Sequence, residues 1–225
     1  MIIKKINYQR VLLACLFILA GALGRILLRD FLPGLPHWSM TIYGITQPVF
    51  ILDMFFVVGI FSLLSGLVIG GYYSFIVPIG IMVLTDIYYG NTFIFLFTWS
   101  GFALMGLLGY FARSKISVNI KSIFPVMGIG IGGILIYDFW TNFGCWLGWY
   151  PHTLDGLLSC YVLALPFTFW HLLSMSLILP ISWILIVLTK KHTFNVRQYV
   201  VAPLEKYITF ATFAFLGITS FVLLL

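Results

Sequence analysis

Long apolar runs alternate with short polar segments along the chain, and this pattern predicts a bundle of membrane-spanning helices. Most runs approach or exceed the roughly 20 residues that a helix needs to cross the apolar core of a bilayer. The predicted spans are residues 11–28, 49–71, 74–89, 92–112, 123–142, 156–188 and 207–225. The sixth run exceeds one span, and we expect Pro166 and Pro180 to break or kink it. The predicted fold class is an all-α polytopic membrane protein.

The segments between the runs predict three polar, aromatic connections at one end of the bundle. Residues 32–47 form a proline-containing loop, residues 89–91 a short turn, and residues 143–155 an aromatic loop that contains two glycines and a proline. We expect a six-helix membrane core over residues 1–192 and an additional C-terminal transmembrane helix within residues 193–225.

The first apolar run has two interpretations. Lys4, Lys5 and Arg10 precede it and Ala20-Gly21-Ala22 lies near its end, an arrangement that resembles a signal peptide with a small-residue cleavage site. We favour an uncleaved first span, because further spans follow it.

Composition excludes a water-soluble enzyme or nucleic-acid binder. Hydrophobic residues make up 62% of the 225 residues and charged residues only 8%, whereas soluble domains carry about 25% charged residues. The net charge of +6 comes from short basic clusters before the first span, after the fourth and after the sixth. Because basic loops stay in the cytoplasm, this distribution predicts a multi-pass protein of the cell membrane with its N-terminus cytoplasmic and its C-terminus outside.

Three aspartates lie near the outer ends of predicted spans. They are Asp53, Asp86 and Asp138. A carboxylate inside a span is costly, so each requires a reason. Their similar depth favours one outward-facing polar cavity, and the alternative is that each caps a helix or pairs with Arg25, Arg29 or a backbone group.

A dense aromatic and polar cluster follows Asp138. Asn142 shares its helix face, and Cys145 and Trp146 join that face if the helix continues by one turn. Aromatic walls with a few convergent polar groups are typical of a small-molecule pocket, and an interfacial aromatic belt is the alternative. The candidate ligand-binding residues are Asp53, Asp86, Asp138, Trp140, Asn142, Trp146, Trp149 and His152. His171 lies within a span, where a bond to a neighbouring helix explains it.

No motif predicts a metal site, a cofactor or catalysis. A His-Glu-x-x-His sequence and a Walker A sequence are both absent. Residues 128–133 fit G-x-G-x-x-G, but they lie inside an apolar span, so close helix packing explains these glycines and Gly66 better. Cys145 and Cys160 lie near the outer face, where a disulfide is the alternative to free thiols.

Residues 141–147, 150–161 and 164–167 together resemble the signature of an uncharacterised prokaryotic membrane family that is related to the substrate-capture (S) components of energy-coupling-factor (ECF) transporters. Asp86, within residues 84–90, matches a second and shorter motif. The resemblance implies a six-helix core with its ligand site near the outer face, under the three connections described above. It also implies as partners a transmembrane coupling subunit and two ATPases.

We therefore expect a membrane-embedded substrate-binding subunit, not an enzyme, for uptake of a small vitamin-like molecule, energised by partner subunits. One alternative is a structural accessory subunit of a larger membrane complex. The other is an intramembrane enzyme that uses Asp138 with His152.

Overall fold

The computed structural model of the protein describes residues 8–31, 38–42, 44–49, 55–90, 92–189 and 203–222. These residues form the helices α1 (Tyr8–Phe31), α2 (Phe55–Leu64), α3 (Tyr73–Tyr89), α4 (Phe95–Ala112), α5 (Ile123–Trp149), α6 (Leu154–Thr189) and α7 (Pro203–Val222). They also form an antiparallel hairpin of β1 (Trp38–Ile42) and β2 (Ile45–Val49), a π-helix η1 (Ser65–Ile69) and a 3-10 turn η2 (Ile120–Ser122).

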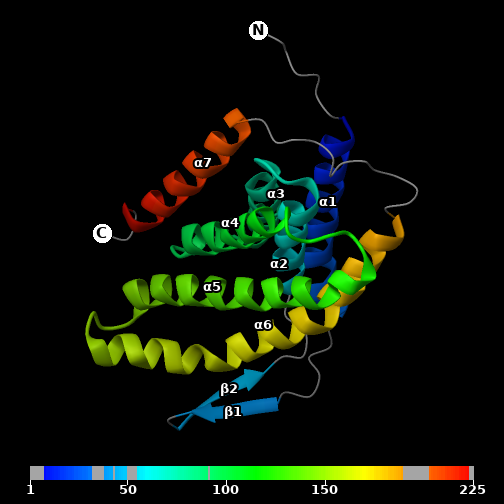
Figure 1. The fold of residues 1–225 in the computed structure, drawn as a ribbon. Helices are drawn as coiled ribbons and strands as arrows, with labels where there is room; N and C mark the ends of the chain where they lie inside the picture. Colours follow the sequence, from blue (N-terminus) through cyan, green and yellow to red (C-terminus); the bar gives the residue numbers. More distant parts are fainter. Residues whose placement is uncertain are drawn as a thin grey trace.

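Within the described part of the chain, four helical segments are long and apolar enough to cross a membrane: Tyr8–Leu27, Phe95–Ala112, Ile120–Trp149 and Leu154–Thr189. Val57–Ile69 and Tyr73–Tyr89 are shorter apolar helices. The described residues are overwhelmingly helical, as the apolar runs predict. The helices pack as a bundle in which α5 and α6 lie side by side, and α7 contacts α4 on another side (Figure 1).

The predicted loop over residues 143–155 is wrong for most of its length. Helix α5 continues to Trp149, so only residues 150–153 connect it to α6. In the sequence, Gly144 and Gly148 indicate a loop, but in the structure both lie within α5 and face aromatic rings. A Cβ on Gly144 would meet the Phe97 ring, and one on Gly148 would meet the Phe93 ring. These glycines let α5 approach aromatic side chains of the α4 region closely, without interrupting the helix.

Helix α6 runs as one helix through Pro166 and Pro180, so neither proline breaks it, although a break was one of the two expected outcomes. It bends along its length without ending (Figure 1). Proline is tolerated inside such apolar helices because neighbouring groups and local adjustments satisfy the carbonyls that it frees.

The first long connection contains a hairpin that the hydrophobic pattern did not predict. Ile42 pairs with Ile45 next to the turn, where Gly44 adopts a φ of 77° that favours glycine. Because β2 extends to Val49, the second span does not begin there; α2 begins at Phe55. The hairpin lies against α6 (Figure 1).

The second span also departs from a single α-helix. Helix α2 passes into η1, which ends at Ile69 and is capped by Gly70 with a φ of 72°. Arg10 Nη2 donates to the carbonyls of Ile69 (3.0 Å) and Gly70 (2.8 Å), and Arg113 Nη1 donates to that of Ile69 (2.8 Å). The two guanidinium groups thus satisfy carbonyl oxygens that the end of a helix leaves without partners.

Glycines allow α4 to approach the backbone of the second span closely. A Cβ on Gly66 would collide with the carbonyl oxygen of Gly106, and a Cβ on Gly109 would collide with that of Leu63. These contacts of α2 and η1 with α4 confirm the predicted packing role of Gly66. Gly128 and Gly132 have no such packing role, because an added Cβ at either position would meet nothing within 4 Å. The prediction of close packing is wrong for these two, because they lie on an open face of α5.

Candidate functional site

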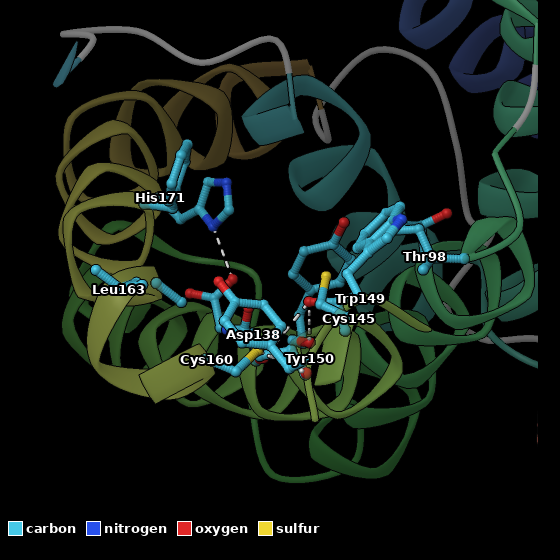
Figure 2. Close-up of a pocket in the computed structure, with 14 residues that line it drawn as sticks. Thr98, Asp138, Cys145, Trp149, Tyr150, Cys160, Leu163 and His171 are labelled. Atoms are coloured by element: carbon cyan, nitrogen blue, oxygen red, sulfur yellow. Dashed lines mark hydrogen bonds and ion pairs between the residues drawn. The ribbon is translucent and has the colours of Figure 1, made fainter. Parts of the chain in front are cut away.

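A cavity of about 310 Å³ lies between α4, α5 and α6, close to the short α5–α6 connection. We call it the α4–α6 cavity. Helix α5 contributes the largest share of its wall and α6 forms the opposite side. Thr98 of α4 and Ile94, which directly precedes α4, close the cavity. Figure 2 shows His171 on one side of the cavity, facing Asp138, and Trp149, Cys145 and Thr98 on the other.

The α5 wall follows from helical spacing. Asp138, Asn142, Cys145 and Trp149 recur every three or four residues, so their side chains share one face of the helix. All four line the cavity, together with Tyr137 and Thr141. The expected shared face is confirmed for Asp138, Asn142 and Cys145, but not for Trp146, which is not among the residues that line the cavity.

The α6 wall has the same periodicity. Cys160, Ala164, Phe167 and His171 lie three or four residues apart and line the cavity. This spacing was visible in the sequence, but the proline within the run and its excess length concealed the single helix face. The sequence therefore predicts for His171 only a bond with a neighbouring helix, and not a place in the pocket.

The most polar feature of the α4–α6 cavity is a buried carboxylate–imidazole pair. His171 Nδ1 lies 2.7 Å from Asp138 Oδ1, and the two residues are 8% and 5% exposed. The pair joins α6 to α5, as expected for His171. The second carboxylate oxygen, Oδ2, is buried and has no hydrogen-bond partner among the described residues. A buried acceptor left without a partner carries a desolvation cost, which a bound donor would relieve.

Asp86 lies elsewhere, in an internal network at the ends of α1, α3 and α4. Its Oδ1 accepts from Arg25 Nη1 at 2.9 Å, and its Oδ2 accepts from Trp99 Nε1 at 2.7 Å. Arg25 also donates to Thr85. Asp86 is not among the residues that line the α4–α6 cavity. Its contact with Arg25 matches the alternative expectation, in which the aspartate pairs with an arginine.

Two of the three candidate tryptophans lie outside the cavity. Trp140 donates its indole N–H to Ser100 Oγ (2.7 Å) and packs against Phe97. Trp146 donates to the carbonyl of Pro151 (3.0 Å). Of the candidate tryptophans, only Trp149 is part of the cavity wall.

His152 also lies outside the cavity. Its Nε2 is 2.8 Å from the carbonyl oxygen of Leu147, within the α5–α6 connection. Asp53 lies outside the described residues, so the structure does not place the third carboxylate of the predicted outer cavity.

Cys145 and Cys160 both line the cavity and both are free thiols. The Cys160 thiol lies 3.4 Å from the carbonyl oxygen of Asn142. Tyr150, in the α5–α6 connection, completes this side of the wall, and burial raises the pKa of its phenol. The phenol therefore keeps its proton, and its ability to donate, to a higher pH than an exposed tyrosine does.

The α4–α6 cavity has features of its lining in common with small-molecule binding sites. Its wall is largely apolar and aromatic, with a few polar groups that converge from two helices, which is typical of such sites. Among the described residues, no three His, Cys, Asp or Glu side chains come together in a way that would hold a metal ion.

Fold and site together define a helical protein with apolar helices long enough to cross a membrane and an aromatic-lined cavity between three of its helices. The chain belongs to the DUF6580 family, a family of unknown function, and the match covers residues 4–198. No curated protein and no solved structure matches the chain.

Proposed function

We propose that this protein is a membrane-embedded substrate-binding subunit that captures a small, vitamin-like molecule in the α4–α6 cavity. The observation that carries the proposal is the buried Asp138–His171 pair in an otherwise largely apolar wall. On insertion scales, placing an aspartate at the centre of a membrane-spanning helix costs about 2.5–3.5 kcal/mol of insertion free energy. A ligand that hydrogen-bonds to the pair explains why an ionisable pair lies among apolar helices despite this cost.

The size and lining of the cavity support this function. A volume of about 310 Å³ is at the lower end of the range for small-molecule pockets. Tyr137, Trp149 and Phe167 offer aromatic surface for a ring, and Asn142 and Tyr150 offer amide and hydroxyl groups beside it.

The proposed topology is a six-helix core over residues 1–192 that crosses the membrane, with α7 as a seventh span. Lys115 and Lys121 are exposed in the α4–α5 connection, whereas the α5–α6 connection, residues 150–153, has neither lysine nor arginine. By the positive-inside rule the α4–α5 connection lies in the cytoplasm and the α5–α6 connection outside. The α4–α6 cavity then opens toward the outer face, where a nutrient arrives.

Uptake requires energy, and we propose that partner subunits supply it: a transmembrane coupling subunit with its ATPases, as in the ECF transporters whose S components the sequence resembles. Capture by this chain and energisation by its partners are separate steps, so ligand binding is testable on the purified chain alone.

The test is thermal unfolding of the detergent-purified protein with a panel of thiamin, riboflavin, pyridoxine, nicotinate and biotin. A ligand that binds only the folded state at about a hundred times its Kd adds about 2.7 kcal/mol of stability. We expect at least one vitamin to raise the unfolding temperature. If none does, and the protein co-purifies instead with a non-transport complex, the alternative of a structural accessory subunit replaces this proposal.

A further inference from the structure

The charge and hydrogen-bonding character of the α4–α6 cavity indicate which kind of ligand it accepts. We infer that the ligand carries a positive charge on an N–H group, attached to a flat or apolar body. This inference rests on the proposed function and narrows it to one chemical class.

The first argument is the charge of the wall. Among the described residues that line the cavity, Asp138 is the one carboxylate and His171 the one imidazole, and none is lysine or arginine. With the imidazole neutral the pair carries one negative charge, and with the imidazole protonated it is neutral. In neither state does the described wall offer a net positive charge for an anion, whereas a cation finds a carboxylate.

The second argument is the direction of the hydrogen bond that remains to be made. Oδ1 of Asp138 is engaged by His171 Nδ1, whereas Oδ2 is buried and has no partner among the described residues. A carboxylate oxygen only accepts. A ligand group that hydrogen-bonds to Oδ2 must therefore be a donor, and a charged N–H donor forms a stronger hydrogen bond to a carboxylate than a neutral one does.

The third argument is the aromatic surface close to the carboxylate. Tyr137 and His171 rings meet edge to face, with centroids 6.0 Å apart, and Phe167 and Trp149 also line the cavity. Aromatic faces attract cations, Trp most strongly, and stack on flat rings. A flat cationic molecule can use both the carboxylate and these faces.

Three probes of nearly identical shape isolate charge as the variable: benzamidine (a cation with N–H donors), benzamide (neutral) and benzoate (an anion). Each is titrated into the purified full-length protein, and binding is followed by tryptophan fluorescence and by the unfolding temperature. We expect benzamidine to bind at least about tenfold more tightly than the other two, as suits a hydrogen bond between charged groups. Equal or tighter binding of benzamide or benzoate overturns the inference.

A pair of variants locates the effect. Asp138→Asn preserves the shape of the side chain but removes its charge, and we expect it to abolish the preference for benzamidine. Asp155→Asn is the matched control, because Asp155 is exposed at the start of α6 and does not line the cavity. The ranking of the probes on the wild-type protein needs no variant, so the inference remains falsifiable if Asp138→Asn does not fold.

The outcomes separate this inference from the proposed function. If a neutral or anionic vitamin stabilises the protein and benzamidine does not bind, the inference of a cationic ligand is wrong, whereas the proposed function of substrate capture is retained. If benzamidine fails to bind and no vitamin binds, both fall.

Discussion

Arg25 Nη1 on α1 lies 2.9 Å from Asp86 Oδ1 on α3, and both residues are only 9% exposed. The Asp86 carboxylate is completed on its other oxygen by Trp99 of α4. One buried carboxylate therefore ties three helices together. This arrangement assigns Asp86 to the stability of the bundle, whereas Asp138 lies at the α4–α6 cavity.

We expect Asp86→Leu alone to destabilise the protein by about 3–5 kcal/mol, because it leaves the buried Arg25 charge without its carboxylate. The double variant Arg25→Met/Asp86→Leu removes both charges and should cost less than Asp86→Leu alone. Free energies of unfolding of the two variants and the wild type in detergent check this. Additive losses in a full cycle with Arg25→Met would show that the pair does not couple the helices.

The candidate tryptophans provide a matched comparison of cavity and non-cavity positions. Trp149→Ala removes an aromatic wall of the cavity, and we expect it to weaken binding of the cationic probe by about three- to tenfold, the range of an aromatic–cation contact. Trp146→Ala should leave the dissociation constant unchanged, because its indole bonds to the Pro151 carbonyl outside the cavity. Titrations of both variants measure this, and equal losses would place the ligand elsewhere.

The glycines that permit close packing can be distinguished from those that do not. Gly66→Ala places a methyl group against the Gly106 carbonyl, and Gly106→Ala places one against that of Ser74. Overpacking of this kind costs about 1–3 kcal/mol or more, and backbone on both sides leaves little room to relax.

Gly128→Ala and Gly132→Ala are the controls for this prediction, since an added Cβ there meets nothing within 4 Å. We expect unfolding temperatures at or slightly above that of the wild type, because alanine favours the helix over glycine. A loss of stability at Gly132 equal to that at Gly66 would contradict the helix contact described above.

Orientation is testable with single cysteines at two exposed positions in opposite connections. Thr153 lies in the α5–α6 connection and Ser117 in the α4–α5 connection, and both are exposed. In cells, a membrane-impermeant maleimide should label Thr153→Cys directly and Ser117→Cys only after permeabilisation. A variant that lacks Cys15, Cys145 and Cys160 supplies the background, and the reverse labelling pattern would place the cavity toward the cytoplasm.

Much of the helical layout could be predicted from the sequence, because apolar runs report directly on apolar helices. The predicted third span, residues 74–89, matches α3 almost to the residue. The pattern was misleading where local signals have two meanings. Gly144 and Gly148 indicate a turn in isolation, yet in the structure they make room for Phe97 and Phe93. Only the partner side chains, far away in the chain, decide between these meanings.

The same limit applies to the site. Helical spacing alone predicted that Asp138 and Asn142 share a face, and both line the cavity. It could not show that Asp86 turns toward Arg25, or that His171, 33 positions after Asp138, completes the polar pair. Those facts depend on how α1, α3 and α6 pack, and hydropathy does not encode that packing.

The central claim, that this chain captures a small molecule at Asp138, is tested most directly by native mass spectrometry of the protein extracted in a mild detergent. We predict a bound mass of vitamin size on the wild type that is lost from Asp138→Asn and retained by Asp155→Asn. A wild-type protein that carries no small molecule and remains bound to other membrane subunits of a non-transport complex would contradict the claim.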